Sequence, residues 1–228
     1  MDLMTTASAP PQPLPSALLL DMDGTLVDSE PYWMAEEFAL VESYGGVWSH
    51  EDAQSIVGRP LTYSASVIRE HTGMPLTIDE IVQRLLGGVV ERFRQHAPWR
   101  PGAKELLDQA QELGVPCALV TMSYTVFANE LEKIVPAGTF SAVVTGDTVT
   151  HGKPHPEPYL TACARLGVEP RTALAIEDSP SGMRSAVAAH VPTIAVPHVV
   201  PVPHEHGAAQ VPTLAGRSLA DLWATATA

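Results

Sequence analysis

Short, continuously apolar runs recur along the chain and predict buried β-strands. They lie at residues 17–20, 117–120, 142–145, 173–176 and 193–196. Strands that are apolar throughout, rather than at every second position, are typical of a sheet that is covered on both faces. Most of these runs end at a polar residue or a turn signal, which limits each predicted strand to a few residues.

Helical patterns separate most of the predicted strands. They lie at residues 103–113, 126–134, 156–166 and 181–189. Strands that alternate with helices indicate a parallel sheet with helices on both sides. The sequence therefore predicts an α/β protein with a Rossmann-like parallel sheet core.

One interval, residues 31–97, breaks this alternation and contains helical patterns without a convincing strand. "PYWMAEEFALVESYG" has helical spacing, and "TIDEIVQRLLGGVVERFRQH" begins with Thr77 and Glu80 in the positions of a capping box. We expect an all-helical inserted cap at 31–97, joined to the core at residues 28–30 and at "APWRPGA". The core then comprises residues 16–30 and 98–228.

Two further segments are predicted to lack regular structure. The composition of residues 1–15, rich in Pro, Ser and Thr, predicts a disordered N-terminal tail. "VPHVVPVPHEHGAAQVPT" contains four prolines and three histidines, and it is expected to be an irregular surface segment. His198, His204 and His206 in it could bind a metal, but a mobile loop is the simpler interpretation.

Charge and cysteine content restrict the partners and the compartment. The chain has 13 Lys plus Arg and 26 Asp plus Glu, a formal net charge of −13, which disfavours nucleic acid and anionic membranes as partners.

Cys117 and Cys163 form neither a disulfide framework nor a metal motif, which favours two buried thiols in a reducing cytoplasm. No apolar run approaches the ~20 residues that span a bilayer, and the start lacks a secretory pattern. The oligomeric state cannot be read, and a monomer is the default expectation.

Acidic residues follow two of the predicted strands. In "LLLDMDGTLVDSE", Asp21 ends the first apolar run and Asp23 follows two residues later; Glu177 and Asp178 end the run at 173–176. Asp and Gly are also common turn residues, so either pair alone would be ambiguous. Carboxyl ends of parallel strands meet at one edge of the sheet, where such acids would repel each other unless a cation such as Mg²⁺ lay between them.

Two other segments place candidate phosphate ligands at the same edge. The run at 117–120 ends in Thr121, Met122 and Ser123, and "HGKPHPEPY" carries Lys153 on a loop before a helix. Taken singly, Thr121 could cap a helix and Lys153 could be a surface lysine. Each of these segments is ambiguous by itself, but their joint order along four predicted strand ends is highly specific.

This order resembles the haloacid dehalogenase-like (HAD) hydrolase superfamily. "DMDGTLVDS" looks like its first motif, "VTMS" its second, "GKPHPEPY" its lysine loop and "IEDSPSG" its fourth. The resemblance covers nearly the whole chain apart from the first ~15 residues and the proline-rich tail. The helical insert after the first motif is similar to the C1 cap of the subfamily that includes β-phosphoglucomutase and many small sugar phosphatases.

The resemblance implies a role for each motif residue. Asp21 would be the nucleophile that forms an aspartyl-phosphate, and Asp23 the general acid and base. Thr121 and the backbone amides of Gly24 and the Met122 region would hold the phosphoryl group, and Lys153 would neutralise charge. The implied Mg²⁺ ligands are Asp21, the backbone carbonyl of Asp23, Asp178, and Glu177 directly or through water.

The cap and the alternatives follow from the same resemblance. Asp28 and Ser29 would lie in a hinge, and Arg59 could bind a second anionic group of the substrate or be a solvated arginine.

A dehalogenase is disfavoured because such relatives lack an acid at the position of Asp23. Trp33 and Thr125 stand where β-phosphoglucomutase has a histidine and a lysine, which favours hydrolysis over a mutase reaction. A non-catalytic binding protein is a further alternative. A small phosphorylated metabolite, such as a sugar or polyol phosphate, is the expected substrate.

Overall fold

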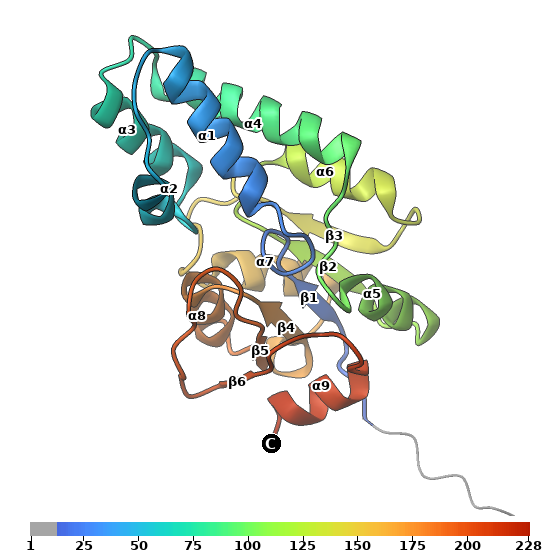
Figure 1. The fold of residues 1–228 in the computed structure, drawn as a ribbon. Helices are drawn as coiled ribbons and strands as arrows, with labels where there is room; N and C mark the ends of the chain where they lie inside the picture. The colour runs from blue at the N-terminus through green and yellow to red at the C-terminus, as the bar shows by residue number, and fades with distance from the viewer. Residues whose placement is uncertain (1–12) are drawn as a thin grey trace, which may run out of the picture.

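The computed structural model describes residues 13–228, and it consists of an α/β core with a helical cap at one edge of its sheet (Figure 1). The first twelve residues of the predicted tail at 1–15 lie outside the described residues. Within the described part of the chain, no helix is long and apolar enough to cross a membrane.

The core is built on a parallel sheet with β1 near its centre. The strand order is β3-β2-β1-β4-β5-β6, and every pairing is parallel. The fold class expected from the sequence is therefore confirmed. The strands are β1 (Leu18–Leu20), β2 (Cys117–Val120), β3 (Phe140–Val144), β4 (Leu174–Glu177), β5 (Thr193–Ala195) and β6 (Ala208–Gln210).

Helices bury both faces of this sheet. On one face Leu18, Leu20 and Leu119 pack with residues of α5 (Ala103–Glu112), α6 (Thr125–Ile134) and α9 (Leu219–Ala226). On the other, Leu19 and Val120 pack with residues of α7 (Glu157–Leu166) and α8 (Pro180–Ala188). A short 3₁₀ helix, Pro170–Thr172, leads into β4. Burial on both faces explains why β1 and β2 are apolar at every position.

The cap is a separate bundle of helices with its own apolar core. It comprises α1 (Glu30–Ser43), α2 (His50–Ile56), α3 (Leu61–Thr72) and α4 (Ile78–Gln95), and Val41, Ile68 and Leu85 are among its buried side chains. The predicted capping box at the start of α4 is confirmed. The Thr77 hydroxyl accepts a bond from the Glu80 amide at 3.2 Å, and the Glu80 carboxylate accepts one from the Thr77 amide at 2.8 Å.

Two glycines in the middle of α4 do not interrupt it, and one of them has a packing role. A Cβ atom at Gly88 would lie 1.9 Å from the Glu36 carboxylate of α1, so glycine permits the close approach of α1 and α4. Glu36 in turn pairs with Arg92 of α4.

The two chain segments that connect cap and core lie side by side. The Asp28 amide bonds the Pro98 carbonyl at 2.8 Å, and the Arg100 amide bonds the Leu26 carbonyl at 2.8 Å. Arg94 near the end of α4 also pairs with Glu130 of α6 at 2.8 Å. The hydrogen bonds between the two linkers, together with this ion pair, restrict how the cap can move relative to the sheet.

Two C-terminal elements, β6 and α9, were not predicted. Residues 197–207 are irregular as expected, but the expectation is wrong for Ala208–Gln210, which pairs with β5 at the sheet edge. The strand is short, partly exposed and contains no β-branched or aromatic residue, so its sequence carries no strand signal.

Candidate active site

A single cavity between the sheet edge and the cap brings together most of the predicted site residues. Its volume is about 160 Å³. The predicted residues that line it are Asp21, Asp23, Gly24, Thr121, Met122, Lys153 and Asp178 from the core, and Arg59 from the loop between α2 and α3. Glu177 is the one predicted site residue that does not line it.

Lys153 is the buried positive charge of the site. Its ammonium donates to Asp21 Oδ1 at 2.7 Å and to the Val120 carbonyl at 2.7 Å, and it lies 2.5 Å from Glu177 Oε1. Burial alone would lower the pKa of Lys153, but the carboxylates of Asp21 and Glu177 raise it above its usual range. Lys153 therefore stays charged beside Asp21.

Glu177 is a buried partner of Lys153 that does not line the cavity. Its side chain is 1% exposed, and its Oε1 also accepts a bond from the Tyr159 hydroxyl at 2.6 Å. Burial raises the pKa of Glu177 to about 7, against the opposing effect of Lys153. Gly182 in the first turn of α8 allows this arrangement, since a Cβ there would lie 1.9 Å from Glu177 Oε2.

The acids of this region fit a divalent cation. Carboxylate oxygens of Asp21, Glu177 and Asp178 lie within 4.8 Å of one another. Burial, and then the charges of Asp21 and Glu177, raise the pKa of Asp178 well above its usual range. Gly24, with φ 81°, leaves room for Asp178, because a Cβ at Gly24 would lie 2.0 Å from Asp178 Oδ2. Lys153 alone does not balance these charges, and oxygen ligands of this kind suit Mg²⁺.

Asp23 is fixed in orientation by side-chain donors on both of its oxygens. Oδ1 accepts bonds from the Ser29 hydroxyl at 2.5 Å and the Trp33 indole at 3.5 Å. Oδ2 accepts bonds from the hydroxyls of Ser123 at 2.7 Å and Thr121 at 3.2 Å. The Thr121 hydroxyl, expected to bind phosphate, thus contacts the predicted general acid in this structure.

The environment of Asp23 favours its protonated form. Burial raises the pKa of the Asp23 carboxyl and the charge of Asp21 adds to this effect, while bonds from hydroxyl groups partly oppose it. A carboxyl group held in this way can donate a proton to an adjacent oxygen atom.

The cap contributes acidic groups to the cavity that the sequence analysis missed. Glu30 and Glu37 line it from α1 together with Trp33, which the sequence had already indicated, and the spacing of three and four residues puts all three on one helix face. Burial raises the pKa of Glu30 to about 7 and that of Glu37 to about 8. The helical spacing in the sequence indicates which residues share a face of α1, but only the folded structure shows which face lines the cavity.

A second missed residue comes from the proline-rich segment. His198 lines the cavity, and its Nε2 lies 2.8 Å from Asp28 Oδ1 at the first linker. Among residues 13–228, the clusters of side chains that could share a metal ion do not include His198, His204 or His206. The segment therefore contributes to the active-site wall.

Replacing Glu37 by Gln is expected to stabilise the protein increasingly as the pH rises from 5 to 8. The pKa of Glu37 is about 8 in the folded protein and about 4.5 for an ordinary glutamate in the unfolded chain, so unfolding in this interval releases a proton and stability falls as pH rises. The contribution is at most about 1.4 kcal/mol per pH unit. Gln can still accept the bond that the Trp48 indole makes to Glu37 at 3.3 Å.

Urea unfolding of both proteins at pH 5 and pH 8 measures this difference, with Glu70→Gln on the exposed surface of α3 as the control. An equal stability difference between Glu37→Gln and wild type at the two pH values would contradict the assignment.

Comparison with known proteins gives the family. The sequence profile described as haloacid dehalogenase-like hydrolase matches residues 18–196. The chain is 30% identical over 188 residues to hexitol phosphatase B of Escherichia coli K12, covering 79% of this chain and 83% of that protein. It is 30% identical over 179 residues to the phosphorylated carbohydrates phosphatase of Thermotoga maritima, covering 78% and 83%.

Solved structures agree with this result. CbbY of Rhodobacter sphaeroides, in a mutant form in complex with xylulose-(1,5)-bisphosphate, superimposes with a TM-score of 0.83 at 25% identity, covering 92% of this chain and 99% of that one. A β-phosphoglucomutase-like protein from Thermotoga maritima has a TM-score of 0.69 at 26% identity, covering 90% and 95%. The profile match spans most of the chain and includes Asp21, Lys153 and Asp178 of the cavity, and on this evidence the chain belongs to the haloacid dehalogenase-like hydrolase family.

Proposed function

We propose that this chain is a Mg²⁺-dependent phosphatase that hydrolyses a small sugar or polyol phosphate through an aspartyl-phosphate on Asp21. The observation that carries the proposal is the contact between the Asp21 carboxylate and the buried ammonium of Lys153, 2.7 Å apart, in a cavity that also contains Asp23 and Asp178. A nucleophile, a cation for the phosphoryl oxygens and a proton donor thus share one enclosed space.

Asp21, Asp178 and the backbone carbonyl of Asp23 would hold the metal. When bound, Mg²⁺ would neutralise charge on the phosphoryl oxygens and on the acids around them. Glu177 supports the site from behind, because its carboxylate is already bonded to Lys153 and Tyr159.

The chemistry of the side chains proceeds in two displacements. The Asp21 carboxylate attacks phosphorus and the ester P–O bond breaks, while the Asp23 carboxyl gives its proton to the departing alcohol oxygen. Asp23 then accepts a proton from water as that water attacks the phosphorus of the aspartyl-phosphate. Inorganic phosphate leaves, and Asp21 is regenerated. Lys153 keeps the Asp21 carboxylate oriented throughout.

Two positions favour hydrolysis over phosphoryl transfer between sugar hydroxyls. Trp33 donates its indole N–H toward Asp23, so it supplies an orienting group and no exchangeable base. The Thr125 hydroxyl is bonded to Asp147 and Thr145, each within 2.9 Å, and Thr125 does not line the cavity. Neither position provides a cation that would retain a second phosphate group.

The cap side of the cavity suits a leaving group with hydroxyls. Glu30 and Glu37, whose pKa values are near neutral, can each accept or donate hydrogen bonds to hydroxyl groups. Arg59 at the cavity rim is available for a second anionic group, such as the other phosphate of a bisphosphate. Acidic groups near the centre and one arginine at the rim favour a polyhydroxylated substrate over a nucleotide or a polymer.

Phosphate release from a panel of substrates tests the proposal. With Mg²⁺, sugar and polyol phosphates are expected to be turned over faster than nucleotides or phosphoglycolate, and chelator should abolish release. Absence of phosphate release across the panel, with or without Mg²⁺, would favour a binding protein that keeps the fold. Formation of glucose 6-phosphate from β-glucose 1-phosphate would favour a mutase.

A further inference from the structure

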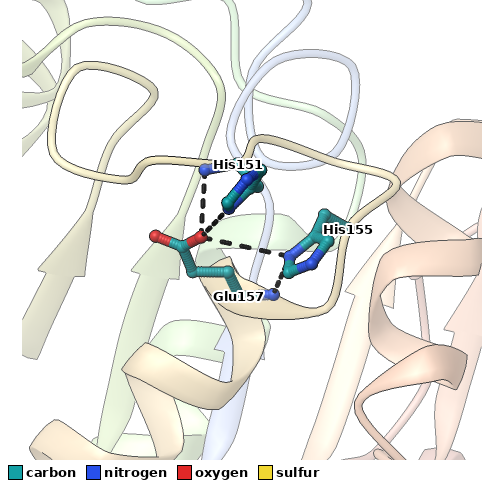
Figure 2. Close-up of side chains that lie close together, drawn as sticks. All are labelled: His151, His155 and Glu157. Carbon is teal, nitrogen blue, oxygen red and sulfur yellow. Dashed lines mark hydrogen bonds and ion pairs between the residues drawn. The ribbon is translucent and has the colours of Figure 1, made fainter.

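The loop that carries Lys153 also presents a cluster of potential metal ligands on its outer side. His151 and His155 bracket Lys153, and Glu157 begins α7 (Figure 2). Lys153 itself points inward and is 3% exposed, whereas the side chains of His151 and His155 are 62% and 51% exposed. The three outer residues are therefore separate from the cavity and open to solvent.

The ligand atoms are close enough to share one ion. Glu157 Oε2 lies 2.9 Å from His151 Nδ1 and 4.0 Å from His155 Nδ1, and one ligand atom from each of the three residues lies within 4.8 Å of the other two. A tetrahedral ion with bonds of about 2.0–2.1 Å requires its ligand atoms to be separated by roughly 3.4 Å. The two imidazoles are exposed, so their side chains have room to adjust toward this separation.

The backbone already holds the carboxylate in place. Glu157 Oε1 accepts a bond from the Thr150 amide at 2.7 Å, and Oε2 accepts one from the His151 amide at 2.9 Å. These amide bonds, together with the His151 imidazole, keep the pKa of Glu157 below its usual range. A fixed, ionised carboxylate between two histidines reduces the ordering that ion binding requires.

His155 presents Nδ1 toward Glu157. This atom accepts a long hydrogen bond from the Glu157 amide at 3.2 Å, and a metal ion at Nδ1 would replace that bond. The ring of His155 lies beside that of His151, with centroids 4.6 Å apart and a tilt of 33° (Figure 2). The Nδ1 atoms of both rings are the ones near Glu157.

The donor set selects a different kind of ion from the one at Asp21. Two imidazoles and one carboxylate suit Zn²⁺, Cu²⁺ or Ni²⁺, whereas Mg²⁺ prefers oxygen ligands. We propose that His151, His155 and Glu157 form a second metal site, which binds a divalent transition-metal ion such as Zn²⁺ on the outer side of the Lys153 loop. An ion at this site cross-links the two ends of that loop.

Zn²⁺ titration of the tag-free, full-length protein in saturating Mg²⁺ tests this site. Calorimetry should detect one Zn²⁺ per chain, and His155→Ala should weaken its binding at least about tenfold, since one of three ligands is lost. His204→Ala, an exposed histidine outside the cluster, should leave Zn²⁺ affinity unchanged. Co²⁺ in place of Zn²⁺ should give visible absorption that depends on His155.

Two results would overturn the proposal: no Zn²⁺ binding by the wild-type protein in saturating Mg²⁺, or equal Zn²⁺ affinity of wild type and His155→Ala. Circular dichroism of each variant shows whether it is folded. Because the readout is binding, a failure here leaves the phosphatase proposal untouched, and absence of phosphatase activity would leave this site untouched.

Discussion

Asp21→Asn is expected to lower phosphatase turnover at least roughly 10⁴-fold while the protein remains folded. An amide has no anionic oxygen to attack phosphorus, so the covalent route is lost. Asn is nearly isosteric with Asp and can still contact Lys153, which lies 2.7 Å from the Asp21 carboxylate. Steady-state phosphate release measures the loss, and circular dichroism measures the fold.

Asp108→Asn is the matched control, because Asp108 is exposed on α5 and does not line the cavity. It should retain wild-type turnover. Turnover of Asp21→Asn within tenfold of wild type would exclude Asp21 as the nucleophile, and Asp23 would then be the next residue to test.

The core of the fold was predictable because its signals are local. The apolar run at β1 ends at Asp21 and the run at β4 ends at Glu177 and Asp178, so each strand and its acids are adjacent in the sequence. Parallel pairing of β1 with β4 then brings these acids together without further information. The same reasoning failed for β6, because a partly exposed edge strand is stabilised by its pairing with β5 and not by its own side chains.

The cap side of the cavity was less predictable because it is formed by two separate folding units. The apolar pattern of α1 shows that it is a helix, but Glu30 and Glu37 acquire their environment only when the cap covers the sheet edge. His198 reaches the same cavity from an irregular segment with no periodic pattern. Such residues become identifiable only through tertiary contacts.

Glu177 shows how much of a residue's environment its position leaves unstated. It ends β4 beside Asp178, which predicts a metal ligand, and its carboxylate does lie in the cluster with Asp21 and Asp178. Its bonds to Lys153 and Tyr159, which also position the lysine, could not be read from the sequence. Tyr159, a fully buried side chain of α7, gave no sign in the sequence of this polar contact.

Lys153→Met is expected to impair both activity and stability. Loss of the ammonium removes charge neutralisation at the phosphoryl group, for which we expect a fall of roughly 10³-fold in turnover. It also leaves the buried carboxylates of Asp21 and Glu177 without their counter-charge, which is expected to cost about 3–5 kcal/mol of unfolding free energy. Phosphate release with Mg²⁺ measures the first effect and urea unfolding in chelator measures the second. Lys104→Met, at an exposed position of α5, is the control.

A second substitution separates the two effects of losing Lys153. Glu177→Gln added to Lys153→Met removes one of the unpaired buried charges, and the Gln carbonyl can still accept the Tyr159 hydroxyl that bonds Glu177 at 2.6 Å. The double variant should therefore regain a large part of the lost stability but no activity, because the cation that contacts Asp21 is still missing. Recovery of turnover together with stability would mean that Lys153 acts only through folding, and its role in phosphoryl transfer would be wrong.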